Sequence, residues 1–261
     1  MKYGTGLTQA FRTLTVLPTP GKDARKVSSQ LFFYPFVGLV VGAIGSLILY
    51  GCTKLFTIST ISSLVLGVLW ACWMAFATRG FHLDGLGDTA DGFGGGWTRE
   101  RRLEIMKDSR TGSFGVIAIC LCLVLKSVCA ASAVSSGKLS ALLWSAIVSR
   151  MCVVLMCSAC SYAKESGLSY DLVKGAGFAH SAIALLQSAA YGAALYFLLQ
   201  GITGWVISPV TLVAMTASAL VCTLVPALVS ARKIGGITGD VLGACCEISE
   251  AAALLAAVFS V

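Results

Sequence analysis

The chain has 261 residues, of which 57% are apolar and only 12% charged, and its net charge is +7. Water-soluble domains of this length are not normally so apolar, so the composition excludes an ordinary soluble enzyme and favours a helical bundle in a membrane. The positive charge does not indicate nucleic acid as a partner, because no soluble basic domain is present to carry it. It suits anionic lipid headgroups, phosphorylated ligands, or both.

The first twenty residues predict a short helix at the membrane surface. One helical face ahead of Pro18 carries four apolar residues: Leu7, Ala10, Phe11 and Leu14. A helix lying in the interface would show this pattern, and so would a helix packed against the bundle. The same residues lack the apolar core of a cleavable signal peptide.

Seven apolar stretches reach the length of about 20 residues that a helix needs to cross the hydrocarbon core. We expect spans at 31–52, 58–77, 114–135, 139–160, 181–199, 206–229 and 242–261. The last stretch contains Glu247 and Glu250 in its first half, which weakens the prediction there. Together the spans predict an all-α, polytopic membrane bundle that forms a single catalytic domain over residues 1–261.

Basic residues sort to one side of these spans. Of the nineteen Lys and Arg, fifteen (Lys2 among them) fall in loops of one side, Lys54 and Lys138 fall on the other, and Lys126 and Arg150 lie within spans. Because Lys and Arg of short loops are retained in the cytoplasm, we expect the basic side to be cytoplasmic. The protein is expected in the inner, cytoplasmic membrane, with its active site facing the cytoplasm.

Half of the twelve acidic residues fall in one polar segment, residues 84–108, between the second and third spans. A helix over residues 82–92 would place Asp84, Asp88 and Asp91 at i, i+4 and i+7, within about 60° of one another. Unpaired carboxylates in that arrangement repel each other, and a bound divalent cation removes the repulsion. Carboxylate ligands without clustered His or paired Cys motifs indicate Mg²⁺, with Mn²⁺ as the alternative, and not zinc.

The second half of this segment combines acids with bases. A helix from about Thr98 would bring Glu104 and Asp108 to one face, within a turn or two of four cations: Arg101, Arg102, Lys107 and Arg110. Metal-binding acids beside phosphate-binding cations are the groups that phosphoryl transfer requires. The alternative is a solvated loop with surface ion pairs. Solubility alone does not explain, however, why three Asp stand in helical register in a segment whose Gly residues weaken a helix.

Three other places in the sequence hold polar residues for which a functional and a structural role are both open. His82 either positions a phosphate or orients a carboxylate, or it is simply a hydrogen-bonded residue at the membrane edge. Arg150 falls near the middle of a span, where a charge is costly unless it is paired and by default indicates a functional residue. The Gly-rich run 232–240 either forms a simple turn or holds phosphate, and its polar members are Lys233, Thr238 and Asp240.

These segments resemble the cobalamin synthase family, whose members are also called adenosylcobinamide-GDP ribazoletransferases. The likeness rests first on HLDGLGDTADG at 82–92 and RLEIMKDSRTG at 102–112. It continues in the family's order through RTLTVLP at 12–18, Tyr34-Pro35 with Gly38, Ser149-Arg150 and GGITGDVLG at 235–243. The resemblance therefore covers nearly the whole chain.

The resemblance implies an integral-membrane enzyme that catalyses the last assembly step of cobalamin biosynthesis. Such an enzyme joins adenosylcobinamide-GDP to α-ribazole, or its 5′-phosphate, and releases adenosylcobalamin, or its 5′-phosphate, and GMP. Magnesium assists the phosphoryl transfer, in which a ribazole hydroxyl attacks the phosphorus attached to the cobinamide. Membrane lipid and other cobalamin-assembly enzymes are the further partners to be expected.

Roles for single residues follow from the same resemblance. The implied metal ligands are Asp84, Asp88 and Asp91, with Glu104 as a further ligand and Asp108 as a ligand or as the base that accepts the hydroxyl proton. The implied catalytic set is Asp88, Arg102, Lys107, Asp108 and Arg110. The implied substrate contacts are His82, Arg150, Lys233, Thr238 and Asp240.

Other functions stay open beside this one. CDP-alcohol phosphotransferases carry an Asp-Gly pair and an Asp-x-x-x-Asp pair on successive membrane helices, to which Asp84-Gly85 and Glu104 with Asp108 are similar. Glu104 replaces an Asp of that pattern, and the Ala-Arg that usually follows is absent. A lipid headgroup transferase, an ion-coupled transporter and a non-catalytic scaffold for the enzymes of one pathway are the alternatives.

Overall fold

The computed structural model describes residues 5–167, 169–199, 201–202, 205 and 207–260. Lys2, and the residues 206 and 261 that bound two predicted spans, lie outside this set. The described residues are helical, without a β-strand, and seven of their helical segments are long and apolar enough to cross a membrane. The protein is therefore a multi-pass membrane protein, as its composition predicts.

All seven predicted spans are present, with their ends shifted by a few residues. They are η1 (Val27–Phe33) continued by α2 (Tyr34–Leu55), α3 (Thr60–Ala77), α6 (Ser113–Ser135), α7 (Leu139–Ala159), α9 (Phe178–Leu199), α10 (Pro209–Ile234) and α11 (Gly239–Phe259). The beginnings of three spans are fixed by side chains that accept a backbone N–H of the first turn, namely Ser59, Ser208 and Thr238.

The centre of the bundle is α7, which is almost completely buried. It packs against α2, α9, α10 and α11, while α3 pairs with α6 at one side. The small residues of α7 and α11 let their backbones approach closely, as is usual between helices in lipid. The outer helices α9 and α10 bury only a narrow stripe and leave the rest of their apolar surface for lipid.

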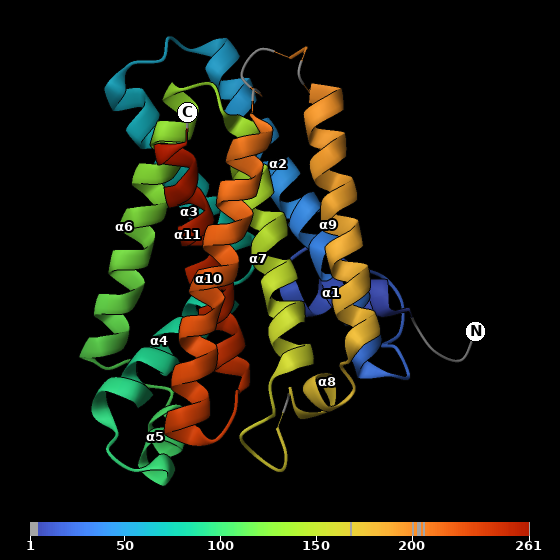
Figure 1. Ribbon diagram of the computed structural model, residues 1–261. Coiled ribbons are helices and arrows are strands. Elements are labelled where there is room, and N and C mark those ends of the chain that lie inside the picture. Colours follow the sequence, from blue (N-terminus) through green and yellow to red (C-terminus); the bar gives the residue numbers. More distant parts are fainter. Residues whose placement is uncertain (1–4, 168, 200, 203–204, 206, 261) are drawn as a thin grey trace.

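Four short helices gather toward one end of this bundle (Figure 1): α1 (Gly6–Leu14), α4 (Phe81–Gly95), α5 (Arg99–Ile105) and α8 (Tyr170–Lys174). The loops that carry most of the Lys and Arg lie at the same end, which we call the basic end. Of the two interpretations of the first helix, the structure shows packing against the bundle, because α1 buries Gly6, Ala10 and Leu14 and lies on η1.

Candidate active site

Two segments far apart in the sequence, α4 and the first turns of α11, touch backbone to backbone at the basic end. A Cβ on Gly85 would lie 2.8 Å from the carbonyl oxygen of Asp240, and a Cβ on Gly243 would lie 3.1 Å from that of His82. The absence of side chains at these two glycines permits the contact. As a result, the acidic helix α4 presents its carboxylates beside Asp240 of α11.

The carboxylates of α4 change from exposed to buried along the helix. Asp84 is exposed, Asp88 is half-buried and Asp91 is buried. Burial, followed by the negative charges of Asp84, Asp240 and Asp91, raises the pKa of Asp88 to about 7. Asp84, Asp240 and Asp91 therefore lie close enough to Asp88 to oppose its ionisation, and Asp240, which the sequence offered only as a substrate contact, belongs to the same acidic cluster.

Asp91 has a separate task from its two neighbours on α4. Its carboxylate accepts the backbone N–H of Gly112 at 2.7 Å and that of Gly115 at 2.8 Å, and so caps the beginning of α6. Gly112 and Gly115 are in direct contact with this carboxylate, and a Cβ on either would collide with it. Seven residues of α-helix rise about 10 Å, so Asp91 shares a face with Asp84 but lies too far along it to share one small ion.

The described residues contain no group of three or more His, Cys, Asp or Glu side chains set to hold a metal ion. Magnesium does not need such a cage, because it usually takes one or two carboxylates and completes its shell with water and substrate phosphate oxygens. Asp84 and Asp88, with Asp240 nearby, offer hard oxygen donors whose mutual repulsion a cation would relieve. The residues present therefore fit a divalent cation.

Much of the positive charge in the polar segment holds α5 in place. Arg99 donates to the carbonyl oxygens of Ile234 (2.9 Å) and Ala163 (2.6 Å), and Arg102 donates to that of Lys233 at 3.1 Å. The bonds to Ile234 and Lys233 satisfy carbonyls at the end of α10 that have no partner within the helix, and the bond to Ala163 ties α5 to the loop after α7. Sequence reasoning missed Arg99, because nothing in its spacing distinguishes it from the neighbouring arginines.

Lys233 attaches the end of α4 to the end of α10. Its Nζ donates to the carbonyl oxygen of Phe93 at 2.8 Å and lies 5.4 Å from the centre of the Phe93 ring. Two residues implied as catalytic or substrate-binding, Arg102 and Lys233, therefore hold α5 and α4, respectively, against the end of α10.

The expectation that Glu104 and Asp108 share one helical face is wrong. Helix α5 ends at Ile105, where Met106 turns inward and packs against Gly92, so Asp108 lies beyond the helix. Glu104 forms an exposed ion pair with Arg101 at 2.8 Å. Lys107 is exposed.

Asp108 is held by a neighbour in its own loop. Its Oδ1 accepts the backbone N–H and Nε of Arg110, each at 3.0 Å, and its Oδ2 accepts the terminal nitrogen at 2.7 Å. These side-chain and backbone hydrogen bonds from Arg110 lower the pKa of Asp108 to about 2. A carboxylate this acidic is a weak proton acceptor, which speaks against Asp108 as the base while the pair is formed.

The Gly-rich run before α11 forms a turn. Gly235 and Gly236 have positive φ values of 80° and 157°, and Ile237 exchanges backbone hydrogen bonds with the chain after α7. Thr238 caps α11 by accepting the N–H of Val241 at 3.3 Å, and its hydroxyl lies 3.2 Å from Asp240 Oδ2. The turn thus sets the position from which Asp240 meets α4.

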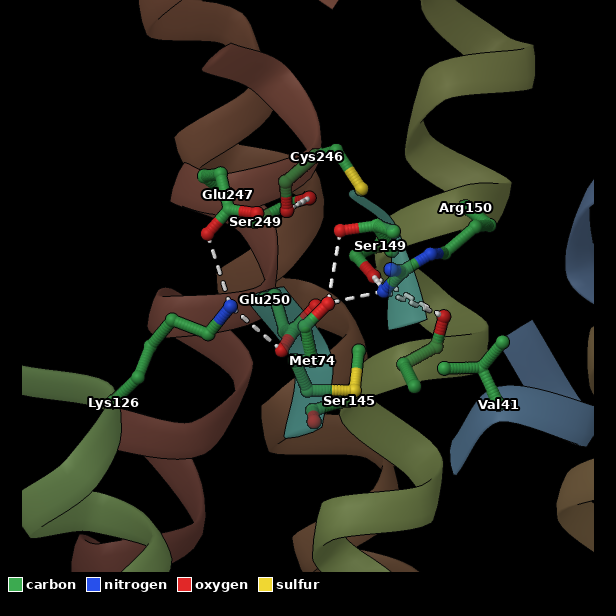
Figure 2. Close-up of polar contacts among 12 residues, drawn as sticks. Val41, Met74, Lys126, Ser145, Ser149, Arg150, Cys246, Glu247, Ser249 and Glu250 are labelled. Carbon is green, nitrogen blue, oxygen red and sulfur yellow. Dashed lines mark hydrogen bonds and ion pairs between the residues drawn. The ribbon is translucent and has the colours of Figure 1, made fainter. Parts of the chain in front are cut away.

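Arg150 lies inside the bundle, in a network of four charges that Figure 2 shows. Its guanidinium is 2.7 Å from Glu250, and Lys126 bridges Glu250 at 2.8 Å and Glu247 at 2.9 Å. Each of these side chains is at most 5% exposed. The network joins α6, α7 and α11 and contains as many acids as bases, which explains how α11 carries two Glu within a span.

A cavity of about 940 Å³ opens beside the start of α4. Its wall includes Asp84, His82 and Arg79, together with residues of α1, η1, α6, α7, α8 and α11. Burial, followed by the positive charge of Arg150, lowers the pKa of His82 to about 3, so this imidazole is neutral. Sequence reasoning did not find the cavity, because its wall is assembled from segments spread over most of the chain.

Comparison with known proteins decides the family. The family model for cobalamin-5-phosphate synthase matches residues 6–258. The chain belongs to this family. Members of the cobalamin-5-phosphate synthase family that are similar to it are named adenosylcobinamide-GDP ribazoletransferase. They include proteins of Chlorobaculum tepidum (39% identical, over 98% of this chain and 96% of the relative), Chlorobium chlorochromatii (40%, over 95% and 93%) and Syntrophobacter fumaroxidans (37%, over 98% and 97%).

The matched region contains α4 and all but the last residue of α11, so the cobalamin-5-phosphate synthase match spans the complete acidic cluster. It also confirms the resemblance drawn from residues 82–92, 102–112 and 235–243. No solved structure matches the chain.

Proposed function

We propose that this protein is an adenosylcobinamide-GDP ribazoletransferase, which joins adenosylcobinamide-GDP to α-ribazole, or its 5′-phosphate, and releases GMP. The family match and the names of its relatives support this reaction. The transfer breaks the bond between the two phosphates of the donor and joins the cobinamide phosphate to a ribazole hydroxyl. Its site must therefore hold a pyrophosphate and neutralise its charge.

The observation that carries the proposal is the close contact of α4 with α11, which brings Asp84 and Asp88 beside Asp240, with Asp84 on the wall of a large cavity. We assign these three carboxylates to a magnesium site, with manganese as the alternative metal. A bound cation would draw charge from the pyrophosphate oxygens while GMP leaves. Asp91 supports the site by fixing the start of α6 behind it, and Arg99 and Arg102 support it by holding α5 against α10.

The proposal also states which side of the membrane the site faces. The acidic cluster lies at the basic end of the bundle (Figure 1), and positive loops are retained on the cytoplasmic side of bacterial membranes. We therefore assign the site to the cytoplasmic face of the inner membrane.

The test is turnover by the purified protein in lipid nanodiscs. With adenosylcobinamide-GDP, α-ribazole 5′-phosphate and Mg²⁺ present, we expect GMP release in step with a new corrinoid product, and neither when one substrate or the cation is removed. Asp84→Asn should abolish turnover, whereas Glu165→Gln, which removes an exposed acid between α7 and α8, should not. Wild-type protein that releases no GMP under these conditions would refute the proposal, and transfer from a CDP-alcohol to diacylglycerol would support the lipid enzyme instead.

A further inference from the structure

The cavity beside α4 has one apolar side and one polar side. Its apolar wall includes Val27, Ile119, Val153, Leu172 and Leu242, which come from five different elements. Its volume of about 940 Å³ lies at the upper end of the range for small-molecule sites, about 300–1,000 Å³. A corrin ring bearing a nucleotide is too large and too polar for such a space, but a nucleoside with an aromatic base is not.

Two buried polar side chains on the cavity wall lack partners. Gln30 and His82 are each only 3% exposed, and neither Gln30 Oε1 nor His82 Nδ1 has a hydrogen-bond partner. Buried polar atoms are rarely left unpaired, because the loss of hydration is then uncompensated. Their placement around one cavity indicates a ligand that brings hydrogen-bonding groups of its own.

The mouth of the cavity is suited to an anion. Arg79 lines the cavity with a left-handed φ of 55°, the one such value among the described non-glycine residues. Gly80 follows with φ 67° and is the N-cap of α4, whose first turn has no side-chain cap. The N–H groups of Gly80 and Phe81 donate to the carbonyl oxygens of Ala75 and Thr78, which leaves those of His82 and Leu83 at this helix beginning for a phosphate. Arg79 adds a full charge beside them. One of its terminal nitrogens is fixed by the carbonyl oxygen of Arg12 at 2.7 Å.

We propose that this cavity is the subsite for the acceptor, a ribazole carrying a 5′-phosphate. The aromatic base lies against the apolar wall, the ribose lies near Gln30 and His82, and the phosphate lies at Arg79 and the beginning of α4. The inference rests on the proposed function and assigns one of its two substrates to a place. An acceptor in the cavity would point its ribose toward Asp84, where the donor pyrophosphate is held from the water side.

The apolar wall decides between the two substrates. Guanine carries several donors and acceptors that would need partners on burial, whereas a benzimidazole-type base is apolar apart from its ring nitrogens. The donor also carries a pyrophosphate. Its negative charge would be repelled by the acidic cluster unless a cation lay between them. The acceptor phosphate needs no metal in this placement, because the guanidinium of Arg79 can pair with it directly.

The test is direct binding of α-ribazole 5′-phosphate, unphosphorylated α-ribazole and GMP to the full-length protein in detergent, by calorimetry without donor or divalent cation. We expect the wild type to bind the phosphorylated acceptor most tightly. Arg79→Asn should weaken that binding about tenfold or more and leave binding of unphosphorylated α-ribazole unchanged. Asn is chosen because it tolerates a left-handed backbone. Lys22→Gln removes an exposed cation away from the cavity wall and should change neither.

A second variant separates a binding role from a structural one. Gln30→Leu should weaken binding of both acceptor forms, yet leave the thermal unfolding temperature unchanged or raise it, because the replaced oxygen has no partner in the unliganded protein. In turnover assays, both variants should raise the KM for the acceptor and leave the KM for the donor unchanged. A raised KM for the donor, or a wild type that binds GMP more tightly than the acceptor, would overturn the assignment. Acceptor binding by a wild type that gives no product would refute the proposed reaction while supporting the subsite.

Discussion

The guanidinium of Arg150 lies 2.7 Å from the carboxylate of Glu250, and the two side chains are 3% and 0% exposed. One comes from α7 and the other from α11, at positions one hundred residues apart (Figure 2). Lys126 of α6 binds the other oxygen of the same carboxylate at 2.8 Å. A charge inside a membrane protein is costly when it stands alone, so Glu250 is the residue through which three helices depend on one another.

Removing the shared acid should therefore destabilise the protein more than removing an acid–base pair. Glu250→Gln leaves Arg150 buried without its counter-charge, and we expect a loss of about 3–5 kcal/mol in the free energy of unfolding. The measurement is reversible unfolding of the detergent-solubilised protein, followed by helical circular dichroism. The double change Arg150→Met with Glu250→Met leaves only Lys126 and Glu247, whose charges balance each other. Its free energy of unfolding should therefore be closer to that of the wild type than the value for Glu250→Gln. Equal losses in the two proteins would contradict this account.

The acidic cluster predicts that one substitution, Asp88→Asn, raises the stability of the protein and lowers its activity. Asp88→Asn removes one of several repelling carboxylates, so it should raise the unfolding temperature at pH 8 in the absence of divalent cation. The same change removes a cation ligand, and we expect turnover to fall about 10²-fold or more. Differential scanning fluorimetry with and without Mg²⁺ tests the first effect, and GMP release tests the second. A variant that loses stability while it keeps its response to Mg²⁺ would show that Asp88 is structural.

The pKa of Asp88, raised to about 7 by burial and by the neighbouring acids, predicts a pH dependence of cation binding. Below pH 7 the folded protein holds a proton on Asp88 that the unfolded chain has lost, and the cation must displace this proton. Affinity for Mg²⁺ should thus fall about tenfold for each pH unit below 7 and level off above it. Titration calorimetry between pH 5.5 and 8.5 measures this, with Asp88→Asn as the control that should lose the dependence. A constant affinity across this range would exclude Asp88 as a ligand.

The sequence predicts the spans and the acidic helix because both depend on local pattern. A stretch of about twenty apolar residues in lipid forms a helix, because its backbone groups must bond to one another. The spacing from Asp84 to Asp91 is likewise that of a helix. The pairing of Arg150 with Glu250 could not be predicted, because it depends on how α7 and α11 are rotated toward each other. For the same reason the spacing alone did not separate Asp91, whose oxygens cap α6, from Asp88, whose charge faces Asp240.

The capping role of Asp91 gives a last prediction, which separates it from the carboxylates assigned to the metal. Asp91→Ala removes two hydrogen bonds to the N–H groups of Gly112 and Gly115, and we expect the free energy of unfolding to fall by about 2–3 kcal/mol. Asp91→Asn keeps one acceptor oxygen and should cost less. Neither change should shift the affinity for Mg²⁺ by more than about threefold, since Asp91 lies too far along α4 to share the ion with Asp84. Unfolding and Mg²⁺ titration on the same preparations measure both quantities. A protein that keeps its stability but loses Mg²⁺ binding would instead make Asp91 a ligand, and would place the cation deeper, against α6.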